Sequence, residues 1–154
     1  MTEKTVKTKK PTKAKAVKEE KAPVKKERYF EAIGRRKESV ARVRLYPKKS
    51  GYEINGKNLN EYFPISRLQG KVIEPLNKIN PDEKFGVVAK VSGGGSTGQA
   101  EAVRLGVSRA LVVFNSELRK KLRRFDLLTR DSRAVERKKF GLKKARRAPQ
   151  WKKR

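Results

Sequence analysis

The chain has 154 residues, of which 43 are Lys or Arg and 16 are Asp or Glu, so its net charge is +27. A chain of this length forms one domain with tails, or at most two very small domains. Cys and His are both absent, which excludes disulfides, zinc fingers, thiol catalysis and the commonest general base. The excess of positive charge favours a nucleic acid as the main partner.

The first segment, residues 1–27, is rich in Lys, Ala and Thr and has low sequence complexity. Up to Arg28 it carries eleven cations and four acids, a net +7. Such a composition cannot bury enough apolar surface to fold, so we predict a disordered extension. It is either a solvated tail or a flexible arm that contacts nucleic acid through charge alone.

Two strands are predicted next. Residues 29–33 are typical of a strand, and Ala41, Val43 and Leu45 alternate with polar residues in the period of a half-buried strand with one basic face. A turn over residues 34–37 would project three cations between them. The candidate phosphate-binding residues of this region are Arg35, Arg36, Lys37, Arg42 and Arg44.

The middle of the chain predicts a further strand and two helices. Tyr52 and Ile54 continue the alternation, and the Asn55-Gly56 pair is a strong turn signal. Residues 58–61 have the spacing of a capping box and open a short helix that ends before Pro64. Ser66 is then placed to cap a second helix with Leu68, Val72 and Leu76 on one face.

The second half predicts one strand followed by two helices. Apolar residues alternate over 85–91, and three glycines follow at 93–95. Ser96 and Gln99 have a capping-box spacing before an amphipathic helix that runs to Phe114, and Ser116 is placed to cap a shorter basic helix. Strands come first and helices mix in, so the predicted class is α+β, with a globular domain over residues 28–129.

Gly93, Gly95 and Gly98 reproduce the spacing of the dinucleotide-binding fingerprint. We reject that function, because Glu117, the candidate ribose-binding acid, opens a basic helix instead of ending a second strand. A more general interpretation is an anion site, at which backbone amides and the helix dipole meet a phosphate; a tight turn is the alternative. The candidate residues are Gly93, Gly94, Gly95, Ser96, Thr97 and Gln99, with Arg104 and Arg109 on the helix behind them. Either arginine could equally form an ordinary intramolecular ion pair.

Residues 130–154 form a basic tail with twelve cations and two acids, a net +10. Like charges repel and little apolar surface is available, so we predict an extended arm that acquires its shape on a polyanion. Phe140 and Trp151 could stack on bases, although Phe140 could instead pack back on the domain. The candidate RNA-binding residues of the arm are Arg130, Arg133, Arg137, Lys138, Lys139, Lys143, Lys144, Arg146, Arg147 and Trp151.

Four segments together resemble one known family, the bacterial form of the small-subunit ribosomal protein numbered nine. They are residues 34–43, 55–63, 93–111 and 129–154, and the last is the most specific. The resemblance covers about residues 28–154 and leaves out the Lys-rich extension. Trp151 stands where many members carry Phe.

The resemblance implies a fold like the second domain of small-subunit ribosomal protein five, which contains a left-handed βαβ crossover that general handedness rules do not predict. It also implies binding to ribosomal RNA in the head of the small subunit, beside neighbouring head proteins. The arm would reach the peptidyl-site transfer RNA. The residues expected to touch that transfer RNA are Lys152, Lys153 and Arg154.

The sequence therefore predicts a structural RNA-binding protein of the cytoplasmic ribosome and not an enzyme. We expect no catalytic residues, metal, cofactor or small-molecule substrate, and no stretch of 18 apolar residues is present to cross a membrane. A DNA-packing protein and a nucleotide-binding enzyme are the alternatives from other classes. Binding to structured RNA and duplex DNA at matched salt would separate the first, and nucleotide titration would test the second.

Overall fold

The computed structural model describes residues 28–79 and 85–152. The extension predicted over residues 1–27 and the terminal pair Lys153 and Arg154 lie outside the described residues.

Within the described residues, five strands form one mixed sheet in the order β1-β2-β5-β3-β4. All neighbouring pairs are antiparallel except β3 and β5, which are parallel. The strands are β1 Phe30–Arg36, β2 Ser39–Tyr46, β3 Gly51–Ile54, β4 Lys57–Asn58 and β5 Gly86–Ser92. The predicted α+β class is confirmed, and the chain between β3 and β5 forms the crossover of a βαβ unit.

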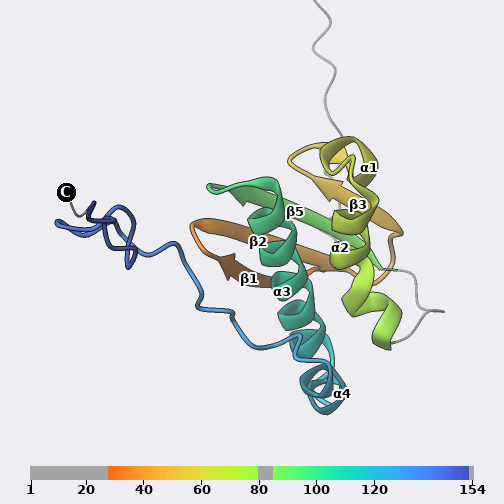
Figure 1. The fold of residues 1–154 in the computed structure, drawn as a ribbon. Helices are drawn as coiled ribbons and strands as arrows, with labels where there is room; N and C mark the ends of the chain where they lie inside the picture. The colour runs from red at the N-terminus through yellow and green to blue at the C-terminus, as the bar shows by residue number, and fades with distance from the viewer. Residues whose placement is uncertain (1–27, 80–84, 153–154) are drawn as a thin grey trace, which may run out of the picture.

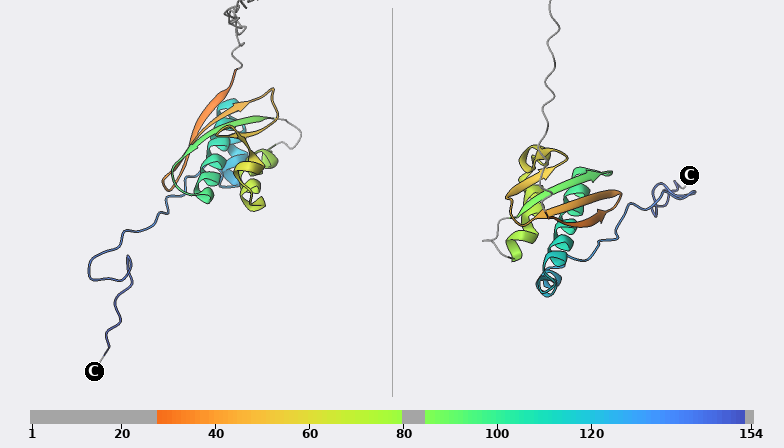
Figure 2. Two further views of the ribbon diagram at one scale, coloured as in Figure 1. Left: turned by 90° about the horizontal axis from the view of Figure 1, so that it is seen from above. Right: turned by 180° about the vertical axis from the view of Figure 1, so that it is seen from behind.

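The helices pack on one face of this sheet and leave the other face open (Figures 1 and 2). They are α1 Leu59–Tyr62, α2 Ser66–Ile79, α3 Ser96–Phe114 and α4 Leu118–Arg124. None of the helices in residues 28–79 and 85–152 is long and apolar enough to cross a membrane.

The core lies between the sheet and helices α2 and α3. Ala41, Val43 and Leu45 of β2 are fully buried and face the helices, as their alternation predicted. Helix α3 was predicted to be amphipathic, but residues around most of its circumference are buried, including Leu105 and Ser108 outside the predicted apolar stripe. It is buried this widely because the sheet packs on one side of it and α2 on another.

Predictions about one turn and two helix caps were wrong. The predicted turn at residues 34–37 starts too early, because β1 continues to Arg36 and the reversal occurs at Lys37 and Glu38. Lys37 has the positive φ of 52° that such a tight reversal requires. The capping residues of α3 and α4 are Gly95 and Glu117 instead of the neighbouring serines, and neither makes a side-chain capping hydrogen bond.

Strand β1 and helix α3 approach each other closely at Gly34. A Cβ atom at this position would lie 1.9 Å from the carbonyl oxygen of Ala102 and 2.5 Å from the amide nitrogen of Gly106. Backbone atoms cannot yield as the end of a flexible side chain can. Gly34 is therefore required by packing, and this contact determines where the amino-terminal end of α3 lies.

Gly34→Ala is expected to lower the free energy of unfolding by about 3 kcal/mol, because the added methyl group forces β1 and α3 apart. Gly70→Ala in α2 is the matched control, since a Cβ there meets nothing within 4 Å. Because alanine favours a helix interior, Gly70→Ala should raise stability by about 0.5–1 kcal/mol. Urea denaturation of both variants measures the difference, and equal midpoints would show that β1 and α3 can separate at little cost.

Candidate nucleic-acid interface

The glycine loop, residues 93–95, joins β5 to α3 and leaves the amino-terminal end of that helix open. Gly93 and Gly94 have positive φ angles of 74° and 62°, whereas Gly95 is extended at φ −112°. No side chain caps the helix, and its first turn contains no acidic residue. The free amides of the first turn and the positive end of the helix dipole are therefore open to an anion.

The glycines of this loop have different structural roles. A Cβ on Gly93 would lie 2.6 Å from the carbonyl oxygen of Glu38, and one on Gly94 would lie 2.2 Å from Oγ of Ser39. These two glycines are required by the fold, as the tight-turn interpretation proposed. Gly95 is different, because a Cβ there would meet nothing within 4 Å. The protein itself does not require glycine at position 95.

The loop is held by hydrogen bonds from buried or half-buried side chains. Oγ of Ser39 and Nε2 of Gln99 each donate to the carbonyl oxygen of Gly93, both at 3.1 Å. The hydroxyl of Tyr62 donates to Oε1 of Gln99 at 2.9 Å. The Gln99 amide is thus used inside the protein, where it orients the loop. Sequence reasoning missed Ser39 and Tyr62, because their partners lie far away along the chain.

A hollow of about 480 Å³ lies beside the loop. Three segments line it, namely the β1–β2 turn at residues 37–39, the loop and first turn of α3 at residues 94–98, and Ala134 with Val135 from the arm. The structure therefore brings together Lys37, Ser96 and Thr97, which were predicted as parts of two separate sites. Its lining residues offer backbone amides, hydroxyls, the ammonium group of Lys37 and the carboxylate of Glu38.

The open face of the sheet carries a second group of cations. Arg42 and Arg44 both contact the carboxylate of Glu31 on β1, with Nε of Arg44 3.0 Å from Oε2. The hydrogen bond from Arg42 is the main reason that the pKa of Glu31 lies below its usual value. The register of β1, β2 and β5 places Arg35 and Lys90 on the same face. The predicted basic face is present, although Glu31 offsets part of its charge.

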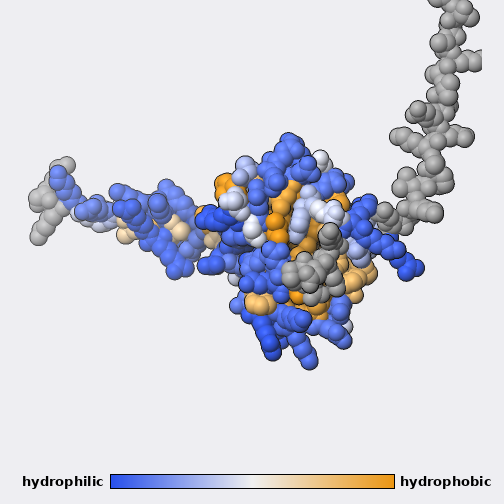
Figure 3. Space-filling view, turned by 90° about the vertical axis from the view of Figure 1, so that its right-hand side faces the viewer, coloured by the Kyte–Doolittle hydropathy of each residue, from blue (hydrophilic) through white to orange (hydrophobic). Residues whose placement is uncertain are grey.

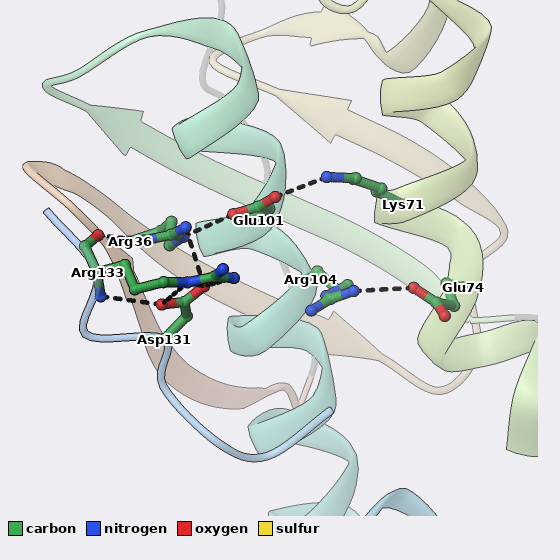
Figure 4. A network of polar contacts seen from close by, with 7 residues as sticks. All are labelled: Arg36, Lys71, Glu74, Glu101, Arg104, Asp131 and Arg133. Carbon is green, nitrogen blue, oxygen red and sulfur yellow. Dashed lines mark hydrogen bonds and ion pairs between the residues drawn. The ribbon is translucent and has the colours of Figure 1, made fainter. Parts of the chain in front are cut away.

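Arg36 belongs to an internal network of ion pairs instead of the exposed turn that was predicted (Figure 4). Its side chain is only 11% exposed, and its Nε lies 2.7 Å from Oε2 of Glu101 on α3. The other oxygen of Glu101 lies 2.6 Å from Nζ of Lys71 on α2. Burial raises the pKa of Glu101, but hydrogen bonds from Lys71 and Arg36 outweigh it and the pKa falls below its usual value.

The same guanidinium reaches the first residues of the arm. Nη2 of Arg36 lies 3.0 Å from Oδ2 of Asp131, and Nη1 donates to the carbonyl oxygen of Arg133 at 2.5 Å. The side chain of Arg133 also binds Asp131, and this hydrogen bond is the main reason that the pKa of Asp131 lies well below its usual range. Arg36 and Arg133 therefore face carboxylates of this chain.

The two arginines predicted on α3 also have partners within the domain. Nη1 of Arg104 lies 3.1 Å from Oε2 of Glu74, and both side chains are about one-third exposed. Nη1 of Arg109 donates to the carbonyl oxygen of Ile33 at 2.8 Å. Arg104 therefore forms the intramolecular ion pair that was the alternative to RNA binding. In residues 28–79 and 85–152, acidic side chains form no cluster of three that could hold a metal ion.

Beyond Val135 the arm runs away from the domain as a largely hydrophilic surface (Figures 1 and 3). Phe140 is 98% exposed, so it does not pack back on the domain, and Trp151 is 91% exposed. Glu136 contacts Arg146 at 2.8 Å and Lys139 at 3.5 Å, and the amide of Lys143 donates to the carbonyl oxygen of Arg147. These local bonds shape a loop within the arm.

Gly95→Val is expected to weaken binding of structured RNA about tenfold, or ~1.4 kcal/mol, because its side chain projects into the hollow and blocks close approach to the helix amides. Its stability should stay within about 0.5 kcal/mol of the parent, since the site is open and the backbone is extended. Gly94→Val is the contrasting variant, and we expect it to unfold. If folded Gly95→Val protein binds RNA as tightly as the parent, the glycine loop only forms a turn and does not contact RNA.

Comparison of the sequence with known proteins identifies the family of this chain. Residues 34–154 match the family model described as "Ribosomal protein S9/S16". A protein of Saccharopolyspora erythraea named small ribosomal subunit protein uS9 is 49% identical over 138 residues, which cover 90% of each chain. Proteins of the same name from Mycobacterium bovis and Mycobacterium tuberculosis are 48% identical over 128 residues, covering 83% of this chain and 85% of theirs. The match spans the sheet, the glycine loop and the arm, and this chain belongs to the ribosomal protein S9/S16 family.

Proposed function

We propose that this protein is a structural constituent of the small ribosomal subunit, where it binds ribosomal RNA in the subunit head. Its relatives carry the name of a small-subunit protein, and this name supports a structural, non-enzymatic role. Its partners would be ribosomal RNA and the neighbouring head proteins, and its location would be the cytoplasmic ribosome.

The observation that carries the proposal is the uncompensated charge of the arm. Its two acids, Asp131 and Glu136, each form ion pairs with two cations. The other described arm cations have no carboxylate partner: Arg130, Arg137, Lys138, Lys143, Lys144, Arg147 and Lys152. Exposed like charges at this density repel one another, and phosphates would relieve that repulsion while releasing counterions.

The globular domain would contribute a different kind of contact. The hollow beside the glycine loop offers free helix amides at a place where Gly95 leaves the backbone accessible. A phosphate group there would accept several hydrogen bonds at once, in addition to its attraction to the helix dipole. Lys37 at the rim and the cations of the open sheet face would extend this contact along an RNA backbone. Contacts of this kind read shape and charge, as expected for folded RNA.

The far end of the arm would reach the peptidyl-site transfer RNA. Residues 134–154 could span roughly 70 Å if fully extended, which is more than the diameter of a small domain. Trp151 and Lys152 are both exposed, so a ring for stacking stands next to a cation for phosphate binding. Lys153 and Arg154 would add two more phosphate contacts. Arg is especially suited to this, because its planar fork matches a phosphate.

Truncation after Val135 should make RNA binding much less dependent on salt, because the deleted segment carries ten of the 43 cations and one acid. Taking the coefficient of duplex DNA, the slope of log affinity against log salt concentration should flatten by roughly 0.9 for each phosphate that the truncated protein no longer neutralises. Deletion of residues 1–27, which removes ten cations and four acids, is the control for charge removed from a chain end. Affinities for structured RNA measured between low and moderate salt give the slopes.

An unchanged slope after the arm truncation would place the electrostatic contacts on the globular domain and contradict the role of the arm. The same titration on duplex DNA tests the alternative of a DNA-packing protein. That alternative requires DNA to bind at least as tightly as structured RNA at matched salt.

Removal of Lys152, Lys153 and Arg154 should leave assembly into the subunit intact but weaken the hold on transfer RNA. Each charge-assisted hydrogen bond to a phosphate is worth on the order of 1 kcal/mol, so dissociation should be about fivefold faster for each one removed. The measurement is the rate of transfer RNA release from the peptidyl site of subunits matched for protein occupancy. Equal rates for truncated and full-length protein would assign the tip a purely structural role.

A further inference from the structure

We propose that Arg36 is a positioning residue that fixes the root of the arm, residues 131–135, against the domain and so completes the hollow beside the glycine loop. The geometric part of this inference concerns the RNA-free protein. Only its consequence for RNA binding rests on the proposed function.

A single guanidinium joins three parts of the chain. Nε of Arg36 contacts Glu101 on α3 at 2.7 Å, Nη2 contacts Asp131 at 3.0 Å, and Nη1 donates to the carbonyl oxygen of Arg133 at 2.5 Å. Figure 4 shows Glu101 on one side of Arg36 and the arm residues on the other. A planar fork can serve these acceptors together, whereas the single ammonium of a lysine cannot span the same set.

Burial gives these contacts their importance. The side chain of Arg36 is 11% exposed, and those of Glu101 and Asp131 are 21% and 31% exposed. Ion pairs at the surface contribute little, but a buried cation that loses a partner retains the full cost of its desolvation. The domain therefore favours the conformation in which the arm supplies Asp131 and the carbonyl group of Arg133.

Apolar packing does not hold the arm against the domain beyond Arg133. Leu127 is 2% exposed and anchors the chain in the core, whereas Val135 is 90% exposed and Phe140 is 98% exposed. The hydrogen bonds and ion pairs of residues 136–147 join arm residues to one another. Polar contacts with Arg36 are thus what direct the chain from Leu127 toward the glycine loop.

The direction in which the arm leaves the domain determines whether its residues line the hollow. Ala134 and Val135 line it together with the β1–β2 turn and the first turn of α3. They follow Arg133 directly, so an anchored Arg133 carbonyl group places them there. Without the anchor these residues would sample many directions, and RNA binding would have to supply the cost of ordering them.

The test is a distance measured between spin labels in the full-length, RNA-free protein. The chain has no cysteine, so two introduced ones carry the labels specifically, as Asn60→Cys on α1 and Val135→Cys in the arm. Both positions are exposed. We expect a narrow distance distribution in the otherwise unchanged protein, and one that is roughly twofold or more broader when Arg36→Ala is added. Arg67→Ala, which removes an exposed cation of α2, is the control and should leave the distribution narrow.

Asp131→Ala keeps the measurement decisive if Arg36→Ala impairs folding, because the Arg36–Glu101 pair remains. It should broaden the distribution as well. A distribution that stays narrow in both variants, or that is already broad in the parent, would overturn the proposal.

Asp131→Ala also separates positioning from charge in RNA binding. It raises the net charge of the protein by one, so electrostatics alone would strengthen the affinity for any RNA. Loss of positioning should instead weaken binding to the folded RNA of the subunit head by several-fold. Tighter binding to that RNA would contradict the positioning role. Failure of the parent protein to bind it would contradict the proposed function while leaving the distance result intact.

Discussion

The contact between β1 and α3 at Gly34 organises the rest of this molecule. With no Cβ at position 34, the strand lies against the helix backbone at Ala102 and Gly106. That approach brings the amino-terminal end of α3 beside the β1–β2 turn, where Glu38 and Ser39 contact Gly93 and Gly94. It also brings Glu101 within reach of Arg36. The glycine loop, the hollow and the root of the arm thus share one packing constraint.

Electrostatic repulsion is the second constraint on a chain with a net charge of +27. Acidic side chains are few among the described residues, and several of them each form ion pairs with two cations. Glu31 contacts Arg42 and Arg44, and Glu101 contacts Arg36 and Lys71. Asp131 and Glu136 have the same arrangement in the arm. This pairing stabilises the domain and leaves most cations of the arm without a carboxylate, which is the basis of the proposed RNA-binding function.

Local patterns were sufficient to predict most elements of the fold. The alternation in β2 and β5 and the apolar spacing in α3 mark the faces that pack on a neighbouring layer, and such burial repeats with the period of the element. In α3 the burial extends beyond that stripe, because α2 packs on a second side. The Asn55-Gly56 turn could be predicted because Asn and Gly tolerate positive φ, here 51° and 80°. The end of β1 could not be predicted in this way. The strand continues through Gly34–Arg36 because of its contacts with α3, which lies some 65 residues further along the chain.

For the candidate site, the sequence alone determined its charge, its glycine loop and its basic arm, because composition and spacing are local properties. Only the tertiary structure decided which of these groups remain available. Arg36 is buried between carboxylates, and the side-chain amide of Gln99 is hydrogen-bonded to the glycine loop. Packing requires glycine at positions 93 and 94 but not at position 95. The physical reason is that a cation looks the same in the sequence whether it faces solvent or an acid from a distant segment. Pairing depends on distances between segments, and those distances exist only once β1, α3 and the root of the arm have packed together.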